Sequence, residues 1–166
     1  MKVLVCISHV PDTTTKINFT SDKKSLVTQG VQFIINPYDE IALTRALELT
    51  EKSGGSVTAI NVGEVITEPT IRKALAIGAA NAVRINAHPK EAIFVAAQIA
   101  EYVKKNSFDL ILCGRESIDF NSASVPSMIA EMLNIPSVAI AKTINVDGIK
   151  AIIEREIEGG KEVVEC

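Results

Sequence analysis

The feature that most constrains the fold is a regular alternation of short apolar runs with segments of helical periodicity. The runs are Val3–Ile7, Val57–Val62, Ala82–Ile85 and Asp109–Cys113, each short and rich in aliphatic residues, as buried strands are. A helical pattern follows each run. Parallel strands need such crossovers, and helices then cover both faces of the sheet. The sequence therefore predicts an α/β fold, a doubly wound, mostly parallel sheet with helices on both faces.

Residues that typically begin or end helices mark the ends of the predicted helices. Asn36 stands where it can cap a helix that begins at Pro37, and Gly54-Gly55 can end that helix. Similar signals predict three further helices, over residues 67–78, from Pro89 to Lys104-Lys105, and over Pro126 to Leu133.

The C-terminal part has a different pattern. Val138–Ala141 predicts a fifth strand. Asp147-Gly148 lies between two apolar runs and indicates a two-residue hairpin, and Glu158–Gly160 is a second turn before a strand at 161–165. A surface hairpin is also predicted around Thr20–Lys24, within an excursion over residues 8–35. Antiparallel hairpins are thus added to the parallel sheet, and residues 1–166 are predicted to form a single domain.

Composition narrows the classes of partner. The formal net charge is −3 and Lys and Arg never cluster beyond a pair, so nucleic acid is not an expected partner.

Cys6, Cys113 and Cys166 are widely spaced and odd in number, which does not indicate a disulfide framework and fits a reducing cytoplasm. The apolar run at the start is too short for a signal peptide, and no stretch is long enough for membrane insertion. We expect a cytoplasmic protein.

Familiar catalytic motifs are missing from the sequence. It contains neither GxGxxG nor GxxxxGK followed by Ser or Thr, the backbone cradles of dinucleotide and triphosphate sites. His9 and His88 are the only histidines, and the spacing of Cys6 and His9 is not supported by further ligands. No Ser or Cys occupies a nucleophile elbow. We predict no catalytic residue and no metal site.

The most informative stretch runs from Asp109 to Pro126, a strand followed by a polar loop and a helix start. Free N–H groups in the first turn of a helix can bind phosphate. Ligands of doubly wound sheets bind beyond the carboxyl ends of the strands, where Ser8–Thr13, Asn36 and the loop after Val62 should also lie. The alternative interpretation is an ordinary loop with serine caps.

Two aspartates in these loops have expected structural roles. Asp119 is predicted to brace the loop before the last helix through backbone N–H groups, because a carboxylate beside a phosphate is repulsive. Asp12 follows Pro11 and precedes three threonines, a context in which an Asx turn is the common outcome.

Five segments of the sequence form a recognisable set: residues 2–13, Asn36–Ala42, Ala74–Ala79, Asp109–Asp119 and Glu154–Gly160. Together, and in this order along the chain, they resemble segments of electron-transfer flavoprotein β subunits. The sequence departs from the family at three positions, because the family usually has Gln where Ser124 stands, Gly at Pro126, and a small or acidic residue at Phe120.

The resemblance implies an adenine-nucleotide α-hydrolase-like fold and a heterodimer with an α subunit. In the family, the α subunit holds most of the redox FAD. The β subunit contributes a site for AMP, or for FAD in electron-bifurcating relatives, and helps pass electrons from dehydrogenases to an acceptor without catalytic residues of its own. The resemblance places the nucleotide against Cys6, Asn36, Pro37, Tyr38, Asp39, Val62, Asp119, Asn121, Ser122, Ala123, Ser124 and Val125.

The resemblance also predicts that this chain is the N-terminal portion of such a subunit. Family members continue for roughly half as much again, through a C-terminal arm and the region that contacts acyl-CoA or other dehydrogenases. The chain stops at Cys166 in mid-strand by pattern, and an open sheet edge there would favour self-association.

Two other functions compete with this interpretation. A stand-alone adenine-nucleotide-binding sensor or stress module without a redox role would need a Gly-rich phosphate turn, which the sequence lacks. An adenylylating or hydrolysing enzyme would need Ser-Gly-Gly after the first strand, where Ser8-His9-Val10-Pro11 stands.

Overall fold

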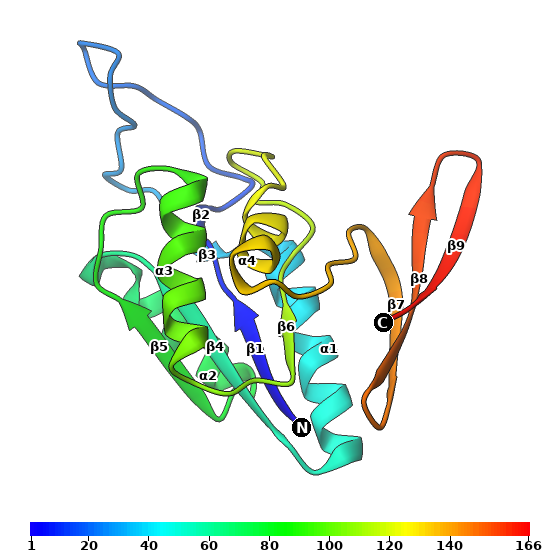
Figure 1. Cartoon of the computed structure of the whole chain (residues 1–166). Helices are drawn as coiled ribbons and strands as arrows, with labels where there is room; N and C mark the ends of the chain where they lie inside the picture. Colours follow the sequence, from blue (N-terminus) through cyan, green and yellow to red (C-terminus); the bar gives the residue numbers. More distant parts are fainter.

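The computed structural model describes residues 1–166, and a four-stranded parallel sheet lies at its centre (Figure 1). The strand order is β5-β4-β1-β6, so the first strand is central and later strands are added on both sides. This winding in two directions confirms the predicted doubly wound α/β fold. The strands are β1 (Lys2–Cys6), β4 (Ser56–Val62), β5 (Asn81–Ile85) and β6 (Leu110–Leu112).

Helices cover both faces of this sheet because its strands are apolar on both sides. In β1, Val3 and Val5 pack in one cluster with Leu43 of α1, whereas Leu4 packs in the opposite cluster with Ile99 of α3. The helices on the first face are α1 (Pro37–Ser53) and α2 (Glu68–Ile77), and those on the second are α3 (Ala92–Lys104) and α4 (Val125–Leu133).

The helix boundaries match the predicted signals in most places. Gly54 adopts the left-handed conformation that ends α1, and Gly78 ends α2. A short 3-10 turn, η1 (Val65–Thr67), precedes α2. The prediction that Pro89 opens the third helix is wrong, because α3 begins at Ala92 after an extended Glu91. No helix combines the length and the hydropathy that crossing a membrane requires.

The excursion after β1 is mostly irregular. Its two ends pair as short antiparallel strands, β2 (His9–Pro11) and β3 (Phe33–Ile35), which the sequence analysis did not predict. The predicted surface hairpin is confirmed in reduced form: Phe19 and Leu26 form a single antiparallel bridge. Figure 1 shows the segment between the two short strands projecting from the domain.

A separate antiparallel sheet completes the chain and lies beside α1 (Figure 1). Its strands are β7 (Ala141–Asp147), β8 (Lys150–Ile157) and β9 (Gly160–Glu165). Ile144 and Ile153 of this sheet are buried with Leu49 of α1.

Two predictions for this region need correction. The fifth strand predicted at Val138–Ala141 does not form, because Ile140 has a left-handed φ of 57° and pairing begins only at Ala141. The hairpin is confirmed, but its loop is Gly148-Ile149, one residue later than predicted, since Asp147 still pairs with Lys150.

Candidate functional site

The carboxyl ends of the parallel strands converge on the amino ends of α1 and α4. Three loops meet there: the one after β1, the one after β4 and the one between β6 and α4. We refer to this region, where the three loops meet, as the crevice. Its floor consists of buried residues at the carboxyl ends of the strands and of the buried polar side chains of Asn36 and Asp39 at the start of α1, which link the loops to one another.

Asp39 is the central residue of this floor. Its side chain is 4% exposed. One carboxylate oxygen accepts a hydrogen bond from the backbone N–H of Ser8 at 2.8 Å, and the other accepts from the N–H of Gly114 at 2.9 Å. Asp39 therefore ties the end of β1 to the loop after β6.

Asn36 makes a second link across the crevice. Its fully buried carboxamide donates to the carbonyl oxygen of Glu116 at 2.8 Å and accepts from the N–H of Ile118 at 3.2 Å. Asn36 is the N-cap residue of α1, as predicted, but its side chain makes no capping hydrogen bond. Both of its polar groups are directed to the loop 80 residues further along the chain.

Gly114 allows α1 to approach the end of β6 closely. A Cβ atom at this position would collide with the carboxylate of Asp39 and lie 2.7 Å from both the Asp39 nitrogen and the carbonyl carbon of Tyr38. Only glycine can accept this contact. The same contact places the N–H of Gly114 within reach of Asp39.

The loop before α4 presents backbone N–H groups. The N–H groups of Ser122, Ala123, Ser124 and Val125 donate to no acceptor in the chain. Ala123 has a left-handed φ of 50° and Ser124 has right-handed helical angles. Consecutive residues of opposite hand direct their N–H groups into one concavity, a geometry that suits an anion.

The alternative interpretation with serine caps is confirmed in position only, because Ser124 is the N-cap residue of α4. The Ser124 side chain makes no capping bond to α4, and its hydroxyl contacts the hydroxyl of Ser122 at 3.3 Å. Asp119 braces less of the loop than predicted: its carboxylate accepts only from the adjacent N–H of Phe120, at 2.9 Å. Asp12 forms the predicted Asx turn with Thr14.

The predicted nucleotide-contacting residues divide into two groups by burial. Cys6, Asn36, Asp39 and Val62 are buried in the floor. The others are more accessible: Tyr38, Ser124 and Val125 are half-buried, and Pro37, Asp119, Asn121, Ser122 and Ala123 are exposed.

Sequence reasoning missed the polar residues that support the crevice from the β4 side. The carboxamide of Asn61 donates to the carbonyl oxygen of Ile7 at 2.7 Å and accepts from the hydroxyl of Thr67 at 2.9 Å. On the β2–β3 pair rather than on β4, His9 stacks on Phe33 with ring centroids 4.3 Å apart. A polar residue inside a predicted buried strand, as Asn61 is, was the available signal. No cluster of His, Cys, Asp or Glu in the structure is arranged to hold a metal ion.

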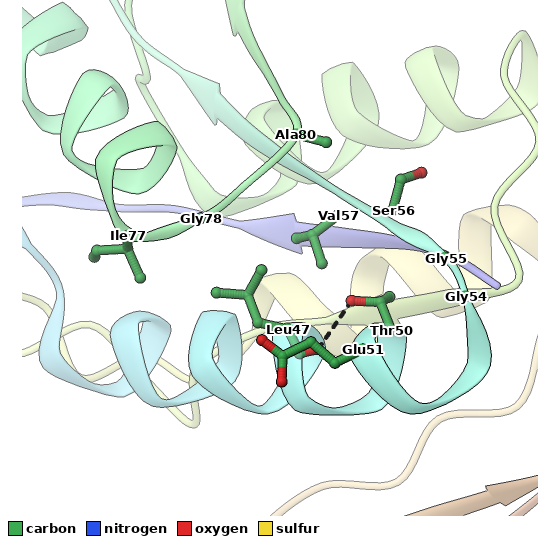
Figure 2. Close-up of a pocket in the computed structure, with 10 residues that line it drawn as sticks. All are labelled: Leu47, Thr50, Glu51, Gly54, Gly55, Ser56, Val57, Ile77, Gly78 and Ala80. Carbon is green, nitrogen blue, oxygen red and sulfur yellow. Dashed lines mark hydrogen bonds between the residues drawn. The ribbon is translucent and has the colours of Figure 1, made fainter.

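Another depression, of about 430 Å³, lies at the opposite edge of the sheet (Figure 2). It is bordered by the last turn of α1, the start of β4 and the end of α2. The hydroxyl of Thr50 lies there but already donates to carbonyl oxygens of its own helix. Because its Thr50 hydroxyl is satisfied in this way, the depression is a weaker candidate than the crevice.

Burial gives Asp39 an unusual pH dependence. Desolvation outweighs the hydrogen bonds from Ser8 and Gly114 and raises the pKa of Asp39 from 3.8 to about 6. The folded state therefore binds more protons than the unfolded state between these values. Stability from this group is full below pH 3.8 and is lost as the pH rises through about 6.

We therefore expect the unfolding free energy of the wild type, relative to that of Asp39→Asn, to fall by about 3 kcal/mol as the pH rises from 3.8 to about 6. Urea unfolding at several pH values measures it. The control is Asp12→Asn, because hydrogen bonds from Thr14 lower the pKa of Asp12 and reverse the sign of the trend. A pH-independent difference for Asp39→Asn would contradict the prediction.

Fold and site together define a doubly wound α/β domain with a polar crevice at the carboxyl edge of its sheet. The chain matches the electron transfer flavoprotein domain over residues 24–166. It is 37% identical to electron transfer flavoprotein subunit beta of Thermoanaerobacterium thermosaccharolyticum, 36% to that of Bacillus subtilis and 35% to that of Homo sapiens, each alignment covering 99% of this chain. The chain belongs to the electron transfer flavoprotein family, as the resemblance predicted.

The chain spans 64%, 65% and 67% of the lengths of these three relatives. Because the alignments cover 99% of this chain, both the parallel sheet and the antiparallel sheet lie within the shared region.

Proposed function

We propose that this chain is part of an electron-transfer flavoprotein β subunit that binds an adenine nucleotide in the crevice and scaffolds an FAD-bearing α subunit. The observation that carries the proposal is the run of four unpaired N–H groups at Ser122–Val125, which ends at the amino end of α4. Such a run suits the phosphate of AMP, or the pyrophosphate of FAD.

The buried floor supports the same proposal because it fixes the loop that carries these N–H groups. Asn36 holds residues 116–118, and Asp39 holds Gly114. Cys6 and Val62 supply the apolar part of this floor. These residues bind and orient a nucleotide, and none of them is assigned a proton or hydride transfer. FAD, when bound, supplies the redox chemistry of the complex.

A carboxylate placed among the N–H groups should oppose phosphate binding. We expect Ser124→Glu to weaken AMP binding at least tenfold, about 1.4 kcal/mol, measured by isothermal titration calorimetry. Ser53→Glu is the matched control, because Ser53 is exposed at the far end of α1, about 25 Å along the helix from the crevice. Equal AMP affinity in the Ser124→Glu and Ser53→Glu variants would contradict the assignment of the phosphate site.

Co-expression with an α subunit tests the wider role. We expect a complex with the absorbance spectrum of bound flavin, and release of an adenine nucleotide on denaturation. If the chain binds AMP but forms no complex with the α subunit, the stand-alone binding module becomes the better interpretation.

A further inference from the structure

Cys6 and Cys113 occupy neighbouring positions at the floor of the crevice. The parallel register of β1 and β6 pairs Leu4 with Ile111 and Val5 with Leu112. When this register is continued by one residue, Cys6 lies beside Cys113. Both cysteines belong to the apolar cluster on the α3 and α4 side of the sheet, so both side chains lie on the same face.

This placement lies within the range that a disulfide needs. Laterally paired residues of adjacent strands are about 4.8 Å apart, and disulfide-bonded residues have Cα atoms roughly 4.4–6.8 Å apart. Cys113 also lies one residue beyond the end of β6. No ladder hydrogen bond therefore holds it, and a small shift can bring its sulfur to Cys6.

The two thiols differ in accessibility. Cys6 is 8% exposed, whereas Cys113 is half-buried just beyond the carboxyl end of β6. The pKa of the Cys6 thiol is raised, chiefly by hydrogen bonding with Cys113 and secondly by burial. An oxidant from solvent therefore reaches Cys113 first, and Cys6 remains a protonated thiol beside it.

We propose that Cys6 and Cys113 form a peroxide-oxidisable dithiol that closes to an intramolecular disulfide at the floor of the crevice. The Cys113 thiolate attacks hydrogen peroxide: an S–O bond forms, the O–O bond breaks, and hydroxide leaves and becomes water. Cys6 then attacks the sulfenic acid sulfur: the S–S bond forms, the S–O bond breaks, and a second water leaves with the Cys6 proton. Two thiols are oxidised and one peroxide is reduced to two waters.

The test uses the full chain carrying Cys166→Ser, which removes the exposed third thiol. After treatment with hydrogen peroxide, we expect both remaining thiols to disappear together and dithiothreitol to restore both. Peptide mapping without reduction should recover the peptides of Cys6 and Cys113 joined to one another. The same mapping of the wild-type chain needs no variant and checks that the disulfide is native to it.

Two single variants test the order of the steps. In Cys6→Ser, Cys113 should accumulate as a sulfenic acid that dimedone traps, and in Cys113→Ser, Cys6 should stay reduced. Circular dichroism establishes that each variant is folded. The proposal is overturned if the wild-type chain yields oxidised Cys113 with free Cys6, or only disulfides between chains, or no loss of either thiol.

Discussion

Gly114→Ala should lower the free energy of unfolding by about 3 kcal/mol or more, near the upper end for overpacking of a protein interior. The added methyl group would meet the Asp39 carboxylate and, at 2.7 Å, backbone atoms of Tyr38 and Asp39. A flexible side chain could rotate away, but backbone atoms at the start of a helix cannot. The first turn of α1 must therefore move away from β6, and the hydrogen bond from Gly114 to Asp39 must break.

Gly160→Ala is the matched control for this prediction. A Cβ atom at Gly160 would meet nothing within 4 Å, and the residue does not have a left-handed φ. Denaturant unfolding of the two variants should show a large loss for Gly114→Ala and a change within about 0.5 kcal/mol for Gly160→Ala. Equal midpoints for the two variants would show that α1 can shift away from β6 at little cost.

The parallel sheet could be predicted because each of its strands is marked by local sequence. Val3–Ile7 and Val57–Val62 are apolar on both faces, and a strand with this pattern must be covered on both sides. The ends of α1 at Gly54 and of α2 at Gly78 could also be predicted from local sequence, because glycine allows the conformations found there. Val138–Ala141 shows the limit: its apolar pattern fits a strand, but the left-handed φ of Ile140 depends on how the chain enters the antiparallel sheet.

The crevice was only partly predictable because its polar contacts are long-range. Asn36 was recognised as a residue at a helix start, and a side-chain cap was the expected local solution. Its actual partners, Glu116 and Ile118, are 80 and 82 residues away and follow no periodic pattern. The same holds for Asp39, whose partners Ser8 and Gly114 come from two different loops. Sequence could place these loops at one edge, but it could not assign their hydrogen bonds.

Asn36→Asp should be as damaging as Gly114→Ala, although it changes only one nitrogen to oxygen. The retained oxygen can still accept from Ile118, but the new oxygen faces the carbonyl oxygen of Glu116 and can donate only if it is protonated. A buried charge without a partner costs about 3–5 kcal/mol. Burial should raise the pKa of the new carboxyl, so the loss of stability should grow as the pH rises from acid to neutral.

Urea unfolding at pH values below and above the pKa of the new carboxyl measures how the loss of stability grows with pH. The control is Asn145→Asp, on the exposed side of β7. The control should change stability by less than about 0.5 kcal/mol at either pH. At neutral pH, Asn36→Asp should also release the loop at 116–118 and with it the N–H groups at Ser122–Val125, so AMP affinity should fall even where the domain remains folded. A variant that lost stability but kept full AMP affinity would separate the two roles, and the phosphate would then be bound without help from the floor of the crevice.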